Sequence, residues 1–216
     1  MIKPYFQDDA VTIYLGDCRE ILPQLRKVDL VLTDPPYGIG EAAGKNKSRG
    51  LLAQPKDYGY AEWDNQPASQ ELINLLINMA TYSIIFGGNF YSLPASSCWF
   101  VWDKDNSGDF ADAELAWTNL KQAVRLFKWR WNGMLQEDMK NKEYRYHPTQ
   151  KPVALIEWCI SKVNNANLIL DPFMGSGTTL RAAKNLGRKA IGIEIEEKYC
   201  EIAAKRMAQT VMELNV

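Results

Sequence analysis

The sequence predicts an α/β fold in three layers, with a mostly parallel β-sheet covered by helices on both faces. Short apolar runs typical of buried strands alternate with longer segments of helical periodicity. One such run, Asn167–Leu170, leads through a glycine-rich turn into a helix and then into the run Ala190–Glu194. That order is typical of a nucleotide-binding βαβ unit. The length of 216 residues fits one domain, 1–216.

Composition narrows the functional classes. The chain is 46% hydrophobic and 24% charged, as in ordinary globular proteins. A net charge of −1 means that any binding to nucleic acid has to rest on local basic patches. Four widely spaced cysteines and one histidine do not form a metal-binding pattern, and we expect reduced cysteines. The span Leu72–Phe86 is interrupted by polar residues and too short for a bilayer, and the amino terminus lacks a signal-peptide core, so we expect a cytoplasmic protein without membrane segments.

The first expected elements are a strand at Val11–Leu15, whose apolar and polar residues alternate, and a helix at Cys18–Arg26. Asp17 stands between them. Its carboxylate could accept a hydrogen bond from a ligand at the end of the strand, or it could cap the helix, because Asp is a preferred N-cap. Both interpretations remain open.

The second expected strand, Val28–Thr33, ends in Asp34, Pro35, Pro36 and Tyr37. Prolines lack an N–H and fix φ at about −65°, so the backbone leaves the sheet in one stiff conformation. Ligands of open α/β sheets bind at the carboxyl ends of strands. An acceptor carboxylate, rigid carbonyls and an aromatic face suit a planar ring that carries an amine, such as a nucleobase. A proline-rich turn without a ligand is the alternative.

A long polar stretch, 38–67, follows, and loops of this length are uncommon inside a domain. It is either a mobile loop that closes over a substrate or a solvent-exposed loop without a function. Its basic residues include three candidates for nucleic-acid contact, which are Lys45, Lys47 and Arg49.

The middle of the chain predicts a helix at Ser69–Tyr82 and strands at Ser83–Gly87 and Ser97–Trp102. The segment Ala111–Trp117 has no clear type. From 119 to 146 the chain has seven Lys or Arg against three Asp or Glu, with aromatic residues between them. Basic side chains can bind phosphates, and aromatic rings can stack on bases. The pattern also fits an amphipathic strand whose basic face is merely exposed to solvent. The candidates for nucleic-acid contact here are Arg125, Lys128 and Arg130.

The last third predicts a helix at Val153–Val163, a second one after the glycine-rich turn to about Leu186, and a third at Glu196–Met212. His147, the only histidine, lies in a proline-rich turn, where a structural role is the more common one. Glu194 follows Gly175 by nineteen residues, close to the spacing of a ribose-binding acid. The turn is neither GxGxxG nor a Walker loop. Together, turn and acid indicate an adenosine-type ligand.

With these motifs located, the chain resembles the β-type amino-methylating DNA methyltransferases, in which the catalytic block precedes the cofactor block. RNA and protein-glutamine methyltransferases with a related motif usually begin it with Asn and place the glycine-rich loop first, which argues against both. The absence of a Pro-Cys pair argues against methylation of cytosine carbon 5. The matching blocks span nearly the whole chain and are Leu15–Cys18, Asp34–Tyr37, Phe86–Asn89, Trp102–Lys104, His147–Pro152 and Asp171–Thr179.

The resemblance implies a Rossmann-like methyltransferase fold, S-adenosylmethionine as cofactor and DNA as substrate. It implies that Asp34 and the Pro35 carbonyl accept from the target amine, while Tyr37 stacks on a base extruded from the duplex. It places Asp17 on the adenine of the cofactor, Glu194 on the ribose, and Thr149 and Lys151 near the methionine carboxylate. The catalytic residues implied are Asp34, Pro35, Pro36 and Tyr37, and the cofactor-binding residues implied are Asp17, Thr149, Lys151, Asp171, Phe173, Gly175, Ser176, Gly177 and Glu194.

Asp at the first motif position, where cytosine-specific members often carry Ser, favours adenine N6 over cytosine N4 as the target. The segment 119–146 is short for the target-recognition region that members carry there. A nucleotide-dependent oxidoreductase would explain Gly175, Gly177 and Glu194 but leaves the Asp34–Tyr37 motif without a role. An inactive DNA-binding module with the same fold is a third alternative. Dimers occur in this family, so a homodimer stays open, as does a restriction-modification context.

Overall fold

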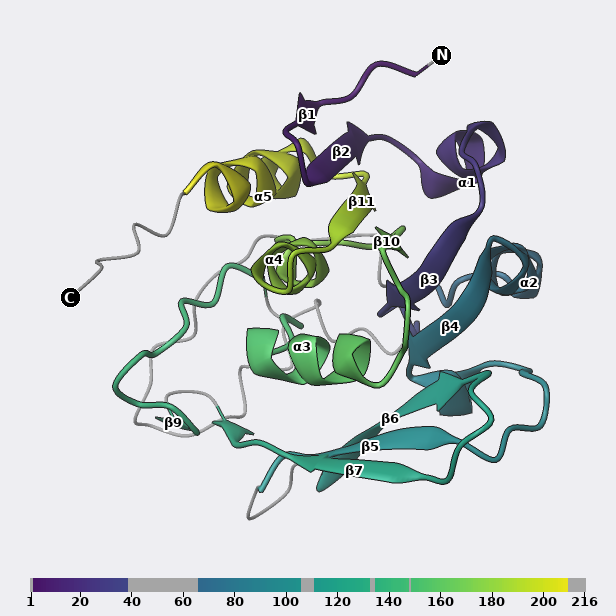
Figure 1. Cartoon of the computed structure of the whole chain (residues 1–216), viewed down its shortest axis with the longest axis vertical. Coiled ribbons are helices and arrows are strands. Elements are labelled where there is room, and N and C mark those ends of the chain that lie inside the picture. Colours follow the sequence, from purple (N-terminus) through teal and green to yellow (C-terminus); the bar gives the residue numbers. More distant parts are fainter. Residues whose placement is uncertain (1, 39–65, 106–110, 133–134, 148, 210–216) are drawn as a thin grey trace.

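The structure, a computed structural model, describes residues 2–38, 66–105, 111–132, 135–147 and 149–209. Within these residues, nine strands form one sheet in the order β1-β2-β11-β10-β3-β4-β6-β5-β7 (Figure 1), and β8 pairs with β9 separately. The strands are β1 (Phe6–Gln7), β2 (Val11–Leu15), β3 (Val28–Thr33), β4 (Ala80–Phe86), β5 (Trp99–Asp103), β6 (Ala113–Thr118), β7 (Arg125–Lys128), β8 (Trp131–Asn132), β9 (Leu135–Gln136), β10 (Leu168–Asp171) and β11 (Lys189–Glu194).

The five strands β2, β11, β10, β3 and β4 are mutually parallel, so their carboxyl ends lie along one edge of the sheet. Strand β6 runs antiparallel to both β4 and β5, and β7 runs parallel to β5. The predicted α/β fold with a mostly parallel sheet is therefore confirmed. Strand β7, from the segment 119–146, extends the main sheet.

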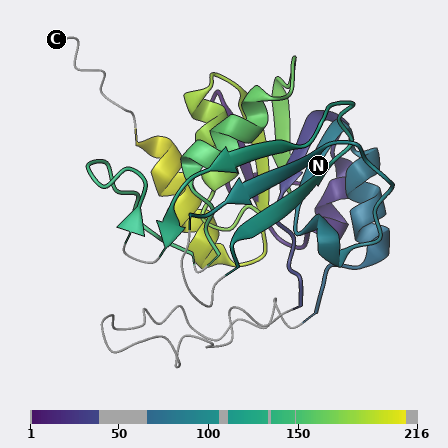
Figure 2. The same ribbon diagram turned by 90° about the horizontal axis from the view of Figure 1, so that it is seen from below.

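Helices cover both faces of the sheet, and Figures 1 and 2 show the two layers from different directions. The side chains of β3 alternate between the layers: Leu30 and Leu32 pack with one hydrophobic cluster, and Val31 packs with the other. One layer holds α1 (Cys18–Ile21) and α2 (Gln70–Asn78), and the opposite layer holds α3 (Val153–Ser161), α4 (Thr178–Asn185) and α5 (Glu197–Ala208).

Some predicted boundaries differ from the structure. The helix expected at Ser69–Tyr82 ends at Asn78, because Ala80 and Tyr82 pair with β3 and extend β4 toward the amino terminus. The helix expected at Cys18–Arg26 ends at Ile21 and continues as the 3₁₀ turn η1 (Leu22–Gln24), where Pro23 cannot donate an α-helical hydrogen bond.

The segment left untyped at Ala111–Trp117 contributes β6, and the last helix ends at Ala208. All four cysteines are buried and free of disulfides. None of the helices in the described residues combines the length and the apolar character needed to cross a membrane.

Candidate active site

Four neighbouring parallel strands each present a carboxylate at the same edge of the sheet. In the order β2-β11-β10-β3, these are Asp17, Glu194, Asp171 and Asp34, and all four line one cavity of about 610 Å³. The parallel registers bring together acids that are far apart in the sequence. Other predicted site residues that line this cavity are Pro36, Thr149, Lys151, Phe173, Gly175 and Ser176.

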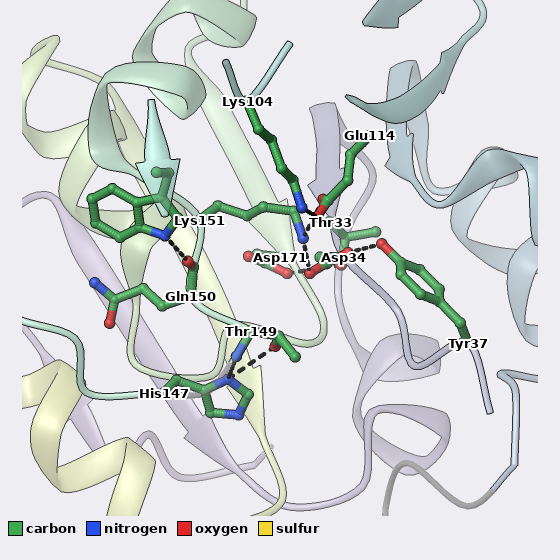
Figure 3. A network of polar contacts seen from close by, with 11 residues as sticks. Thr33, Asp34, Tyr37, Lys104, Glu114, His147, Thr149, Gln150, Lys151 and Asp171 are labelled. Carbon is green, nitrogen blue, oxygen red and sulfur yellow. Dashed lines mark hydrogen bonds and ion pairs between the residues drawn. The ribbon is translucent and has the colours of Figure 1, made fainter. Parts of the chain in front are cut away.

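Asp34 is the centre of a polar network (Figure 3). The Tyr37 hydroxyl donates to one of its carboxylate oxygens, and the Lys151 ammonium lies 2.5 Å from the other. The Asp34 side chain keeps 22% of its surface accessible, on the cavity wall. Burial raises the pKa of Asp34 above its usual value, and the Lys151 charge opposes that rise. An acceptor carboxylate therefore faces the cavity next to a positive charge.

The turn after Asp34 is held rigidly. The Pro36 carbonyl accepts from the Ala68 N–H at 3.0 Å and from the Tyr91 hydroxyl at 2.6 Å. The Tyr37 ring stacks on Phe90, with ring centroids 4.9 Å apart. Gly87 has a φ of +63°, and a Cβ at this position would lie 2.1 Å from Tyr37 Cε1. Only glycine at 87 leaves room for the tyrosine ring where it lies.

Asp171 and Glu194 are anchored by donors from the backbone and from Thr33. The Thr33 hydroxyl donates to Asp171 at 2.8 Å, and the Phe173 N–H donates to the same oxygen at 3.1 Å. Glu194 accepts from the N–H of Gly175 at 3.0 Å and from that of Glu196 at 2.9 Å. Burial raises the pKa of Asp171 to about 6 and that of Glu194 to about 7. Such carboxylates gain from any ligand that brings hydroxyl or ammonium donors.

Asp17 caps a helix and also lies on the cavity wall. Its carboxylate caps α1 by accepting from the Arg19 N–H at 2.8 Å, and it also lines the cavity. The Arg19 guanidinium pairs with it and lowers the pKa of Asp17. Capping and ligand contact are thus compatible at this position.

His147 is buried, and its ring packs edge-on against Tyr199 with centroids 4.5 Å apart. Its Nδ1 lies 3.0 Å from the Thr149 hydroxyl. Burial lowers the pKa of His147 to about 3, so the imidazole is neutral at physiological pH. Because the His147 side chain also lines the cavity, the structural role expected for it stays a prediction.

Three residues predicted to belong to the site are not among those that line the cavity, and these are Pro35, Gly177 and Tyr37. Pro35 is buried, and Gly177 is the N-cap of α4, where a Cβ would lie 2.9 Å from the Cβ of Ala203 in α5. Gly177 thus allows close packing of two helices. Tyr37 approaches the cavity through its hydroxyl contact with Asp34.

Of the three basic candidates within the described residues, two share one acidic partner and the third lies at the other end of its strand. Lys128 and Arg130 both pair with Asp105, the former at 2.7 Å. Lys128 ends β7 at the same edge of the sheet as the cavity, whereas Arg125 begins β7 at the far end. The remaining candidates lie outside the described residues, and these are Lys45, Lys47 and Arg49.

Glu114, Thr33 and Gln150 are site residues that sequence reasoning missed. Glu114 pairs with Lys151 at 3.1 Å and also with Lys104. The Gln150 side chain accepts from the Ser176 hydroxyl at 3.0 Å. No motif signals Glu114, because it lies in a segment whose strand character the sequence did not reveal. Thr33 could have been found as the residue directly before Asp34.

Comparisons with known proteins place this site in a family. The model of a family described as DNA methylase matches residues 101–205. The putative methylase YubD of Escherichia coli is 30% identical over 213 residues, which cover 89% of this chain and 88% of YubD. The chain belongs to the DNA methylase family.

Two further relatives cover nearly the whole of this DNA methylase. The type II methyltransferase M2.LlaDCHI of Lactococcus lactis is 28% identical over 258 residues, covering 96% of this chain and 93% of that protein. A solved structure described as an M1.HpyAVI–SAM complex is 30% identical, with a TM-score of 0.56, and covers 91% of this chain and 99% of that one. The protein is an amino-methylating DNA methyltransferase that uses S-adenosylmethionine, as the sequence predicted.

The residues of the cavity fit this cofactor. The volume of about 610 Å³ lies in the range of small-molecule sites. Carboxylates along the edge can accept from the ribose hydroxyls and the ammonium group. The buried Thr178 hydroxyl, at the start of α4 in the cavity wall, has no hydrogen-bond partner within the described part of the chain. A ligand that reaches α4 would satisfy it.

Proposed function

We propose that this DNA methylase transfers the methyl group to the exocyclic N6 amine of adenine in DNA, with Asp34 as the group that accepts from the amine. The observation that carries the proposal is the carboxylate of Asp34 on the cavity wall, next to Asp171, at the end of β3. Asp at this position is the first support for adenine. The second is a relative from Escherichia coli named DNA adenine methyltransferase YhdJ, which is 27% identical over 94% of this chain.

The chemistry needs an acceptor because an exocyclic amine is a poor nucleophile, with its lone pair delocalised into the ring. Asp34 and the Pro35 carbonyl would draw the N–H bonds of the amine toward tetrahedral geometry and localise the lone pair. Bound S-adenosylmethionine supplies an electrophilic methyl group on its sulfonium. Positioning and fixed dipoles then do most of the catalysis. Pro36 keeps the turn rigid, and Tyr37 would stack on the extruded base.

For the cofactor, we propose that Glu194 binds the ribose hydroxyls and that Asp17 contacts the adenine. Their positions on neighbouring strands support this pairing. Phe173, Gly175, Ser176, Thr149 and Asp171 would line the rest of the cofactor. Gly177 would act as a packing residue of the same turn, because a Cβ at this position would lie 2.9 Å from the Cβ of Ala203.

For DNA, we propose contacts from Lys45, Lys47, Arg49, Lys128 and Arg130, with a weaker contribution from Arg125 at the far end of β7. Segment 119–146 would act as a short target-recognition region. Phosphate contacts by these side chains would make the affinity for DNA fall steeply with salt. A homodimer remains part of the proposal, and sedimentation of the purified protein tests it.

The experiment is methyl transfer from S-adenosylmethionine to unmethylated genomic DNA, followed by digestion to nucleosides and mass spectrometry. We expect N6-methyladenine. N4-methylcytosine would keep the mechanism and overturn the choice of base. Asp34→Ala should reduce the rate by about a hundredfold or more while the protein still binds S-adenosylhomocysteine. Full activity of Asp34→Ala would refute the role of Asp34.

A further inference from the structure

We propose that Lys151 and Glu114 form a buried charge pair that positions Asp34. The Lys151 ammonium then binds the Asp34 carboxylate and not the methionine carboxylate of the cofactor. This inference rests on the proposed function of Asp34. It changes the role that the family resemblance implies for Lys151, and it adds Glu114, which no sequence motif indicates.

The geometry is that of a continuous chain of charges (Figure 3). The Lys151 ammonium lies 2.5 Å from Asp34 Oδ2 and 3.1 Å from Glu114 Oε2, and Lys104 pairs with the other oxygen of Glu114. Tyr37 closes the chain at its other end through Asp34 Oδ1. The ammonium therefore has two carboxylate partners within the protein itself.

The members come from elements that only the fold brings together. Asp34 follows β3, Glu114 lies in β6, Lys104 follows β5, and Lys151 stands just before α3. Lys151 and Phe86 both line the cavity, and the Lys151 ammonium lies 5.1 Å from the centre of the Phe86 ring. With 9% of its side-chain surface accessible, Lys151 has little freedom to turn toward another partner.

A buried ammonium requires compensation, since removing it from water is costly unless carboxylates surround it. Asp34 and Glu114 provide two negative charges, and they raise the pKa of Lys151 against the effect of burial. Lys151 and Lys104 together lower the pKa of Glu114. Charge-assisted hydrogen bonds from Lys151 then fix the direction of the Asp34 carboxylate.

This arrangement matters because the ionised Asp34 carboxylate is a stronger acceptor for an amine N–H than the protonated acid. The groups that face Asp34 are Lys151, which favours its ionised form through charge, Tyr37, which favours it through a hydrogen bond, and Glu114, which opposes it. Asp171 lies on the neighbouring strand and is itself partly protonated near pH 6. His147, a further titratable group near Lys151, is neutral. The two members of the pair therefore act on Asp34 in opposite directions.

Two substitutions test these opposite effects on the pKa of Asp34. Lys151→Met removes the favourable charge and should raise the pKa of Asp34 by about one unit or more. Glu114→Gln removes the unfavourable charge, leaves Lys151 in place and should lower it. The measurement is the carbon-13 titration of the Asp34 carboxyl by NMR, with its signal identified by its loss in Asp34→Asn. The NMR titration does not depend on methyl transfer. A failure of this inference can therefore be distinguished from a failure of the proposed function.

The kinetics of methyl transfer provide a second measurement. Single-turnover methyl transfer from a preformed complex with S-adenosylmethionine should show its acid limb at higher pH in Lys151→Met, with a rate at least about tenfold lower near pH 7. The dissociation constant for S-adenosylhomocysteine should stay within about twofold of the wild type. Lys184→Met is the matched control, because Lys184 pairs with Asp8 at 2.6 Å at the opposite end of the sheet.

A loss of binding of S-adenosylhomocysteine by Lys151→Met, with an unchanged Asp34 titration, would overturn the inference and return Lys151 to the cofactor. Shifts of the Asp34 pKa in the same direction in both variants would also overturn it. If Lys151→Met fails to fold, the double variant Lys151→Met/Glu114→Gln keeps the net charge of the pair. Glu114→Gln by itself also tests the proposal, because an unchanged or raised pKa of Asp34 in this variant would contradict it.

Discussion

Cofactor binding should depend on pH through Glu194. Burial raises the pKa of this carboxyl to about 7, so in the free protein it carries a proton over much of the range below neutrality. Ribose hydroxyls donate hydrogen bonds, and they favour the ionised carboxylate. Binding therefore has to expel the proton, and the affinity should increase as the pH rises through about 7.

The magnitude follows from the ionised fraction. For a pKa of about 7, roughly nine-tenths of Glu194 is ionised at pH 8 and roughly one-tenth at pH 6. The affinity should therefore fall about tenfold from pH 8 to pH 6, which corresponds to about 1.4 kcal/mol. Asp171, with a pKa raised to about 6, is about half protonated at the lower pH and adds a factor of about two.

The assay is calorimetric titration with S-adenosylhomocysteine at pH 6, 7 and 8, in buffers of different ionisation enthalpy. The buffer dependence should reveal about half a proton or more released per binding event at pH 7 and below. Glu194→Gln should bind more weakly, and its dependence on pH should shrink to the factor of about two from Asp171. An affinity that stays flat across this range in the wild type, with no proton release, would refute the role of Glu194.

Two other substitutions probe the site. Gly87→Ala should displace the Tyr37 ring, since the added Cβ would lie 2.1 Å from Tyr37 Cε1, and methyl transfer should fall by about tenfold or more while S-adenosylhomocysteine still binds. Gly187→Ala is its control, with a similar φ of +66° and no atom within 4 Å of the added Cβ, and equal losses in both variants would contradict the argument. Thr33→Val should lower the free energy of unfolding at pH 8 by about 1–3 kcal/mol, because ionised Asp171 loses a donor at 2.8 Å. Urea unfolding should show a smaller loss at pH 5, where Asp171 is protonated, with the exposed Thr81→Val as control, and a loss independent of pH would count against this account.

Much of the fold and of the site could be predicted because the signals are local. The strand that ends at Asp34 is marked by an apolar run and two prolines, which cannot extend a sheet. The turn after Asp171 is marked by glycines, and Gly175 and Gly177 both adopt positive φ. Boundaries were less accurate where pairing decided them, as at Ala80, which continues a helical pattern in the sequence but belongs to β4 in the structure.

The sequence by itself determined the α/β class, the motif at Asp34–Tyr37 and the acids at the ends of β10 and β11. These features depend on residues that are neighbours in the chain, so backbone chemistry and spacing suffice to reveal them. Only the tertiary structure decided the partners of Lys151. Its contact with Asp34 joins residues 117 positions apart, and Glu114 reaches it because β6 pairs antiparallel between β4 and β5. A charge network of this kind arises from the order of strands in the sheet, which no local pattern of residues encodes.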